Sequence, residues 1–378
     1  MRVLFVTLAV PFPPNNGQRM RNWGLLRALA EEGHSVALLS FAESYDFAQD
    51  LSALRETCDS VQLVPLPSKQ AGRGGEALAR LRRLASPLPY GTFRYRSREM
   101  EAAVRGFLDQ GKVDIVLCDD IYQFGNMPES ARHSLLLNKH DLTSVIMRRL
   151  VTLTWNPLKL AYGWLECGKL RRWEALISGR AGGVLVCTEL DARVLQAMVP
   201  SIRMTIAPNV IDVNGYASSQ CAEGETILYF GAMDYHANQD AVEFFVSRIL
   251  PQVRRLVPDV KLVVAGRNPP HQFLRRFTGL ASIEFTGTVP DMRVEIAKAA
   301  VCVVPLRIGS GTRLKILEAA AMAKPIVSTR VGAEGLDFVD GEEIILADEP
   351  KLFARAVADL LAEPARRKML GEAARRRV

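Results

Sequence analysis

Long apolar runs and paired cysteines are both missing from this sequence of 378 residues. No apolar stretch reaches the roughly 18 residues that a membrane-spanning helix needs, so we expect any membrane contact to be peripheral. The six cysteines include no Cys-x-x-Cys pair, and we interpret them as reduced, small hydrophobic residues of a cytoplasmic protein.

Most short catalytic signatures are absent too. The sequence has no Gly-x-Gly-x-x-Gly after an expected strand, no Walker A motif, no His-Glu-x-x-His and no nucleophile elbow. Hydride transfer and nucleoside triphosphate hydrolysis are therefore disfavoured. Asp119 and Asp120 follow an expected strand, but adjacent side chains point in different directions and a third ligand is missing, so we expect no metal and no cofactor.

The composition is that of a globular protein with an excess of positive charge. Hydrophobic residues make up 48% and charged residues 24%, and the length predicts two domains of about 100–200 residues each. The 48 lysines and arginines exceed the 41 aspartates and glutamates, and the net charge of +7 suits an anionic ligand such as a sugar diphosphate, or an anionic membrane face. No recognition-helix, zinc or RNP-like motif accompanies this charge, so we expect no nucleic-acid partner.

Short apolar runs alternate with helical patterns along the chain, which is typical of parallel βαβ units. Strands are expected in the first half at residues 2–8, 35–41, 60–64, 113–118, 134–138 and 182–187. In the second half, strands are expected at 226–231, 260–265, 282–286, 300–304, 325–328 and 343–346, and helices at about 239–257, 291–299 and 313–323. We therefore predict an α/β fold with two Rossmann-like, doubly wound parallel sheets, at residues 1–212 and 225–378, which are joined by a polar linker at 213–224 and face each other across a ligand cleft.

Residues 69–105 are rich in arginine, and Arg94 and Arg96 lie there among apolar and aromatic side chains. The segment is either a basic surface for an acidic or lipid-linked acceptor, with peripheral membrane contact, or a solvated helical face; the sequence leaves both interpretations open. Three tryptophans of the first half are expected to pack a helical region rather than to form a sugar platform: Trp155, Trp164 and Trp173.

The most informative stretch is residues 309–318, Gly-Ser-Gly-Thr-Arg-Leu-Lys-Ile-Leu-Glu, which leads from an expected strand into an expected helix. A glycine-rich turn at a helix N-terminus exposes backbone N–H groups and the positive end of the helix dipole, and both suit a diphosphate. Arg313 and Lys315 add positive charge, and a carboxylate at Glu318, about one turn further, can accept both hydroxyls of a ribose. In the alternative interpretation, Thr312 only caps the helix and Glu318 pairs with a nearby base.

Residues 311–319, followed by 324–327 and 332–335, resemble the donor-binding region of retaining family-4 glycosyltransferases, which have the GT-B fold. The resemblance continues at residues 13–21, 230–234 and 264–266, so it spans nearly the whole chain, and it is nearest to bacterial exopolysaccharide-type sugar transferases. It implies a metal-independent transferase that moves a sugar, with retention, from a nucleotide-diphosphate sugar to a glycan, lipid-linked or small-molecule acceptor. The first domain would then bind the acceptor and the second the donor, with UDP the commonest nucleotide.

In that family two glutamates eight positions apart frame the donor site, and the second matches Glu318. The first falls on Ser310, so this sequence departs from the family where the transferred sugar is usually contacted. The arginine and lysine with which the family grips the diphosphate have no clear match in residues 231–241, and we expect backbone groups and the side chains of Arg313 and Lys315 to replace them. The expected donor site comprises Gly17, Gly231, Val289, Ser310, Gly311, Thr312, Arg313, Leu314, Lys315 and Glu318, and the expected catalytic residues are His140, Arg313, Lys315 and Glu318.

The resemblance also assigns roles to residues whose position alone is ambiguous. Gly17 would let the backbone approach the donor diphosphate, although an ordinary loop glycine explains it as well. His140 matches a family histidine near the transferred sugar, whereas a lone histidine beside Asp141 is otherwise often structural. Val289 lies where the family binds the base through backbone groups. The candidates for acceptor contact are Arg19, Arg21, Arg94 and Arg96.

Two alternative functions remain open. A nucleotide-sugar 2-epimerase of the same architecture would turn over the donor without an acceptor, but the several acids and bases that it needs are not located in this sequence. A catalytically silent protein that binds a nucleotide-sugar or a carbohydrate is the other alternative, and Ser310 in place of a glutamate supports it.

Overall fold

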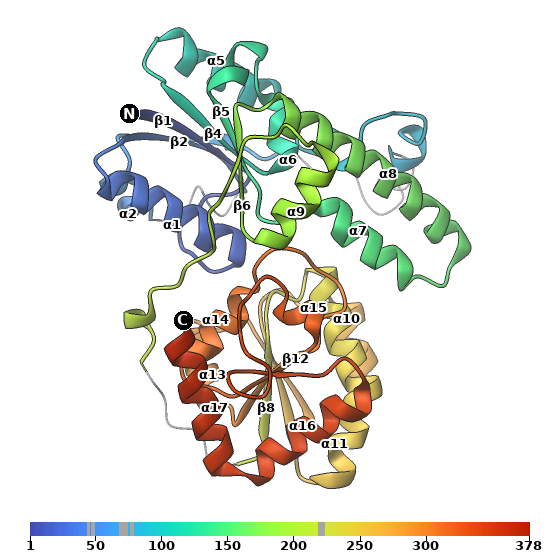
Figure 1. Cartoon of the computed structure of the whole chain (residues 1–378). Helices are drawn as coiled ribbons and strands as arrows, with labels where there is room; N and C mark the ends of the chain where they lie inside the picture. The colour runs from blue at the N-terminus through green and yellow to red at the C-terminus, as the bar shows by residue number, and fades with distance from the viewer. Residues whose placement is uncertain (44–45, 47–49, 68–74, 76–78, 218–223) are drawn as a thin grey trace. The chain divides into compact units, whose positions relative to one another are not determined.

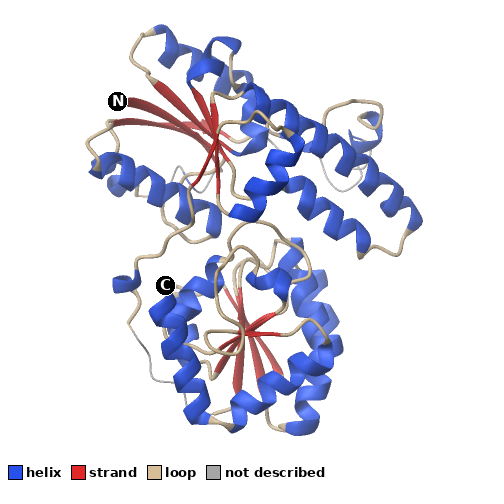
Figure 2. Ribbon diagram, in the orientation of Figure 1, coloured by secondary structure: helices blue, strands red, loops and turns tan. Residues whose placement is uncertain are grey.

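The computed structural model describes all residues except 44–45, 47–49, 68–74, 76–78 and 218–223. The chain divides into two compact units, Met1–Pro208 and Asn209–Val378. Each unit has one parallel sheet with helices on both of its faces (Figures 1 and 2). Part of the predicted linker at 213–224 lies outside the described residues, and its beginning forms a 3-10 turn, Val213–Gly215, within the second unit.

The first unit has a seven-stranded sheet in the order β3-β2-β1-β4-β5-β6-β7, with every pair parallel. Its strands are β1 Arg2–Thr7, β2 Ser35–Ala42, β3 Ser60–Pro65, β4 Ile115–Asp119, β5 Leu135–Asn138, β6 Gly183–Val186 and β7 Met204–Ile206. Its described helices are α1 Gly17–Glu31, α2 Ser52–Thr57, α4 Tyr90–Arg94, α5 Arg98–Asp109, α6 Asp120–Gln123, α7 Thr143–Thr152, α8 Pro157–Arg180 and α9 Glu189–Met198, with 3-10 turns at Phe124–Asn126 and Glu129–Ser134. Apolar strands such as β1, which is almost wholly buried, form the core between the two helical layers.

The second unit has a six-stranded parallel sheet in the order β10-β9-β8-β11-β12-β13. Its strands are β8 Thr226–Phe230, β9 Lys261–Ala265, β10 Ile283–Gly287, β11 Val301–Val304, β12 Ile326–Ser328 and β13 Ile345–Leu346. Its helices are α10 His236–Phe244, α11 Leu250–Leu256, α12 His271–Leu274, α13 Met292–Lys298, α14 Leu314–Ala321, α15 Arg330–Ala333, α16 Pro350–Ala362 and α17 Pro364–Arg377, with a π-helical turn at Phe245–Ile249 and a 3-10 turn at Arg275–Phe277. In both sheets the strand order reverses beside the first strand of the unit, which is where doubly wound sheets bind ligands at the carboxyl ends of their strands.

The predicted fold class of two Rossmann-like parallel sheets is confirmed. Strand β7 was not predicted, because its Met204–Ile206 segment is only three residues long and two of them are exposed. The helix predicted at 239–257 was wrong in its bounds: α10 begins earlier, at His236, and the π-helical turn separates it from α11. Five of the six cysteines are free and buried, as predicted, and Cys221 lies outside the described residues. Among the described helices, none is long and apolar enough to cross a membrane.

At Gly371, in the middle of α17, this helix packs closely against the turn that follows α14. A Cβ atom at Gly371 would lie 1.9 Å from the carbonyl oxygen of Ala323, a backbone atom that cannot rotate away. Gly371→Ala is therefore expected to destabilise the protein by about 1–3 kcal/mol, although alanine is the better helix former. Gly106→Ala in α5 is the matched control, because nothing lies within 4 Å of its Cβ position, and it is expected to stabilise the protein slightly. Thermal unfolding of both variants tests the difference in sign; a neutral Gly371→Ala would contradict it.

Candidate functional site

A glycine-rich turn precedes α14 and is folded around the side chain of Arg313. The backbone of Gly311 has a φ of 72°, which favours glycine, and a Cβ at Gly309 would lie 2.2 Å from the guanidinium of Arg313. The same guanidinium donates hydrogen bonds to the carbonyl oxygens of Ser310 and, at 2.7 Å, Gly311. Arg313 is buried, so in this structure its side chain holds the turn, and direct contact with a diphosphate stays a prediction.

The first turn of α14 directly follows this glycine-rich turn. Arg313 is the N-cap residue and its side chain makes no capping hydrogen bond, so the alternative in which Thr312 is the cap is wrong. Leu314 is buried and Thr312 is half-buried. The N-terminal backbone groups of a helix without a side-chain cap suit an anion.

Lys315 reaches from α14 to the end of strand β8. Its Nζ donates hydrogen bonds to the hydroxyl oxygen of Tyr229 at 3.0 Å and to Oδ1 of Asn238 at 2.9 Å, and it lies 4.3 Å from the centroid of the Tyr229 ring. A Cβ at Gly231 would lie 2.9 Å from this Nζ, so a residue without a side chain leaves room for the ammonium group. Burial, followed by the charge of Arg313, lowers the pKa of Lys315 to about 7. An anion bound beside Lys315 would raise this pKa and favour the charged form of the lysine.

Glu318 lies one turn further along α14 and is partly buried. The hydroxyl of Tyr216 donates a hydrogen bond to its Oε1 at 3.2 Å, so its partner is a tyrosine rather than the base of the alternative interpretation. Burial raises the pKa of Glu318 to about 7, against the opposing effects of Tyr216 and the charge of Lys315. Tyr216 was missed because its segment was predicted to be a linker. In the structure Arg375 donates a hydrogen bond to the carbonyl oxygen of Tyr216, and Arg293 donates one to that of Gly215.

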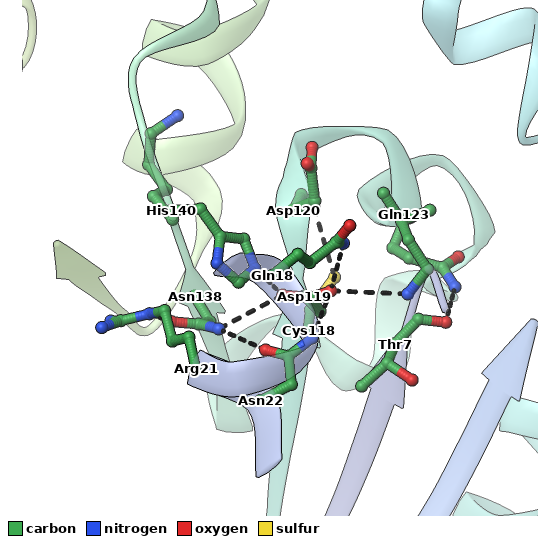
Figure 3. Close-up of polar contacts among 12 residues, drawn as sticks. Thr7, Gln18, Arg21, Asn22, Cys118, Asp119, Asp120, Gln123, Asn138 and His140 are labelled. Carbon is green, nitrogen blue, oxygen red and sulfur yellow. Dashed lines mark hydrogen bonds and ion pairs between the residues drawn. The ribbon is translucent and has the colours of Figure 1, made fainter. Parts of the chain in front are cut away.

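In the first unit, a buried polar network converges on the carboxylate of Asp119 at the end of β4 (Figure 3). Its Oδ2 accepts hydrogen bonds from Asn22 at 2.9 Å and from Gln18 at 3.0 Å, both on α1. Its Oδ1 accepts a hydrogen bond from Asn138 at 3.2 Å, at the end of β5, and forms a short contact with Nε2 of His140. Asp119 therefore joins the helix that begins at the Gly17 loop to the segment that carries His140.

The charge of Asp119 also sets the state of His140. Burial lowers the pKa of the imidazole, but the charge and hydrogen bond of Asp119 outweigh it, so that the pKa of His140 is raised above its usual value. Burial raises the pKa of Asp119, and His140, Asn22 and Gln18 together outweigh it, so that its pKa is lowered. Both shifts favour the ion-paired form of these two groups, and 15% of the His140 side chain is exposed. The adjacent Asp–Asp sequence indicated this position, but only as a weak metal candidate.

Other predicted residues of the first unit lie around this network or apart from it. Gly17 is the first residue of α1, behind the N-cap Asn16. Arg19 is buried in an ion pair with Asp46, 3.0 Å between Nη2 and Oδ1. Arg21 is also buried and donates hydrogen bonds to Oδ1 of Asn138 at 3.0 Å and to the carbonyl oxygen of Ala207 at 2.7 Å. In this structure both arginines hold the unit together, and contact with an acceptor or a phosphate stays a prediction.

The remaining predicted residues are more exposed. Arg94 and Arg96 are exposed, and Arg96 lines a cavity of about 190 Å³ whose walls include Phe93, Phe124 and Trp173. Residues 69–74 and 76–78 of the basic segment lie outside the described part of the chain. Val289 is half-buried and follows the end of β10 by two residues. No three His, Cys, Asp or Glu side chains of the described residues come together as a metal site requires, and metal independence stays a prediction.

The family described as "Glycosyl transferases group 1" matches residues 224–363, which hold the turn before α14 together with Lys315 and Glu318. Residues 224–363 form a glycosyl transferases group 1 domain. This domain includes all six strands of the second sheet and ends at the boundary between α16 and α17.

Relatives extend the comparison beyond this domain. The "uncharacterized 44.6 kDa protein in cps region" of Klebsiella pneumoniae is 23% identical over 368 residues, which cover 94% of this chain and 90% of that protein. The GDP-mannose-dependent alpha-(1-6)-phosphatidylinositol monomannoside mannosyltransferase of Mycolicibacterium smegmatis is 34% identical over 142 residues, 34% of this chain and 37% of the relative.

Solved structures share the fold over the full length. Sucrose-phosphate synthase from Thermosynechococcus elongatus aligns with a TM-score of 0.69 and 18% identity, covering 100% of this chain and 94% of that chain. The Anabaena protein HepE in complex with UDP aligns with a TM-score of 0.66 and 13% identity, again covering 100% and 94%. At these identities the likeness shows the fold, which is the GT-B architecture of two Rossmann-like units.

Proposed function

We propose that this protein is a glycosyltransferase that transfers a sugar, with retention, from a UDP-sugar to a glycan, lipid-linked or small-molecule acceptor. The observation that carries the proposal is the start of α14, where a glycine-rich turn, Lys315 and Glu318 lie together inside the glycosyl transferases group 1 domain. The Anabaena neighbour was solved with UDP, which supports a uracil nucleotide, whereas the Mycolicibacterium relative is named for GDP-mannose. The identity of the nucleotide base is therefore the first property to determine.

The chemistry follows from where negative charge develops. When the bond between the anomeric carbon and the donor diphosphate breaks, the diphosphate gains charge while the sugar becomes oxocarbenium-like. The N-terminus of α14 and the ammonium of Lys315 would stabilise that leaving group, and Glu318 would hold the ribose. The acceptor would attack from the face that the diphosphate leaves, with a phosphate oxygen taking its proton, and His140 would contact the transferred sugar. No metal is needed in this scheme, and we place the reaction in the cytoplasm.

A thermal-shift screen against UDP-, GDP-, ADP- and dTDP-sugars, with the free nucleotides beside them, tests the proposal. One strong shift would identify the base, and flat curves throughout would contradict a nucleotide-sugar site. Product analysis with and without an acceptor extract then distinguishes the alternatives: donor turnover without an acceptor would indicate an epimerase, and binding without turnover would indicate a silent binding protein.

Binding of UDP is expected to take up about one proton at pH 8. At this pH Lys315, whose pKa is lowered to about 7, is mostly neutral, and a diphosphate beside it raises that pKa and charges it. Calorimetry in two buffers that differ in ionisation enthalpy measures the uptake. At pH 6 the uptake is expected to disappear, because Lys315 is then already charged. Binding at that pH should instead release protons, because Glu318, whose pKa is raised to about 7, is mostly protonated there and would bind the ribose as a carboxylate. Binding of UDP at pH 8 without proton uptake would show that Lys315 does not face the diphosphate.

A further inference from the structure

Helices α7 and α8 form a hairpin that projects from the first unit, and the connection between them is its outermost end (Figure 1). The inner face is closely packed: a Cβ at Gly163 would lie 2.4 Å from Cγ2 of Val151, and the Sγ of Cys167 contacts the carbonyl oxygen of Ser144 at 3.5 Å. Glu174 is fully buried, where it accepts hydrogen bonds from Thr143 and Ser144 and pairs with Lys139. These contacts fix which face of α8 points outward.

The exposed side chains of the hairpin include large apolar ones, which the prediction of packed tryptophans did not foresee. Trp155, in the connection, is 98% exposed, and Leu158, in the first turn of α8, is 81% exposed. Trp164 and Leu165, two turns further, are exposed as well. Only Trp173 packs as predicted, with its ring edge against Phe124 and its Nε1 donating to the carbonyl oxygen of Ile121. An exposed tryptophan beside exposed leucines is typical of an interaction surface.

The exposed charged side chains of residues 142–188, which include the hairpin, are all positive. Arg148, Lys159, Arg171 and Arg172 are exposed on the hairpin. Residues 142–188 contain only two acidic residues, Glu166 and Glu174. Both are buried, and each pairs with a lysine: Lys169 for Glu166 and Lys139 for Glu174. Within residues 142–188, exposed tryptophan and leucine are therefore combined with exposed cations and with no exposed acidic side chain.

We propose that the α7–α8 hairpin, at Trp155, Leu158, Trp164 and Leu165, is a docking surface for an anionic lipid bilayer. Tryptophan and leucine enter the boundary between headgroups and acyl chains, while arginine and lysine stay among anionic headgroups. Each cation near an anionic surface strengthens binding about fivefold. A second copy of the chain fits this face poorly, because the same cations would meet across the contact. The inference is independent of the proposed function, since it concerns a different surface from the donor site.

The test is flotation of the purified protein with phosphatidylcholine vesicles, with and without phosphatidylglycerol. We expect the protein to float with the anionic vesicles at low salt, and binding to fall with added salt and without phosphatidylglycerol. Trp155→Ser, and separately Leu158→Ser with Lys159→Gln, are each expected to weaken this binding about tenfold. The matched control makes the same two changes at Leu352 and Lys351 on α16, where Leu352 is 58% exposed, and is expected to float like the wild type.

Lipids brominated near the headgroup provide a second readout, since they should quench the fluorescence of the wild type more than that of Trp155→Phe. The proposal is overturned if the wild type does not float, if the hairpin variants float as well as the control, or if Trp155 is not quenched in bound protein. Light scattering addresses the competing occupant: a wild-type dimer that the hairpin variants convert to monomer would assign this surface to self-association instead. Nucleotide binding should be the same in all the variants, so a failure here leaves the donor site untouched.

Discussion

Glu318→Ala is expected to weaken nucleotide binding about 100-fold while the protein remains folded. A carboxylate that accepts both hydroxyls of a ribose makes two charge-assisted hydrogen bonds, and alanine removes both. The measurement is the Kd for UDP, or for whichever nucleotide gives the largest thermal shift. Glu372→Ala on α17, which removes an exposed carboxylate from the same unit, is the matched control and should bind normally.

Stability gives an independent readout of the same substitution. Because burial raises the pKa of Glu318 to about 7 from a usual value near 4.5, its charged form opposes folding above the usual pKa. The alanine variant should therefore be at least as stable as the wild type at pH 8, and any advantage should vanish at pH 4, where the carboxyl is protonated in both the folded and the unfolded chain. Normal nucleotide affinity in the alanine variant would exclude Glu318 from the ribose site.

Asp119→Asn is expected to lower kcat for sugar transfer about 100-fold, with a smaller effect on the donor KM. An amide of the same size cannot replace the carboxylate, because its NH2 group would face donor amides in either orientation: those of Asn22 and Gln18, or that of Asn138. His140 would also lose the neighbouring charge that raises its pKa. Burial lowers the pKa of His140, and without the charge of Asp119 to outweigh burial this pKa should fall below its usual value.

Nuclear magnetic resonance of the histidine rings measures that pKa without any substrate, with His140→Gln to assign the signal. Asp120→Asn is the control, because Asp120 is the neighbouring carboxyl and contributes less than Asp119 to the raised pKa of His140. Asparagine also tolerates the backbone φ of 69° at position 120. Since the folded-state pKa of His140 is raised, its stabilising effect is fully present below the usual pKa and is lost as the pH rises through the folded value. An unchanged His140 pKa in Asp119→Asn would refute the coupling of these two groups.

Hydrophobic periodicity was sufficient for the fold class. Runs such as Val301–Val304 and Ile326–Ser328 are mainly apolar and are buried along their whole length, which is typical of strands between two helical layers. Helix bounds were less predictable. Within the π-helical turn at Phe245–Ile249, Phe245 packs edge-on against Phe353 of α16, a residue more than 100 positions away.

For the proposed donor site, the sequence by itself indicated the glycine-rich turn, Lys315 and Glu318. Glycines, a cation and a carboxylate that follow one another at a helix N-terminus lie close together whatever the rest of the fold. Only the tertiary structure decided their partners. Tyr216 comes to Glu318 from 102 positions away, Tyr229 comes to Lys315 from 86, and Asp119 comes to His140 from 21. Tertiary packing likewise buried Arg19 and Arg21 and left Trp155 exposed. Residue type indicates the chemistry that a side chain can perform, whereas burial and long-range contacts decide whether that side chain meets solvent, a partner or a ligand.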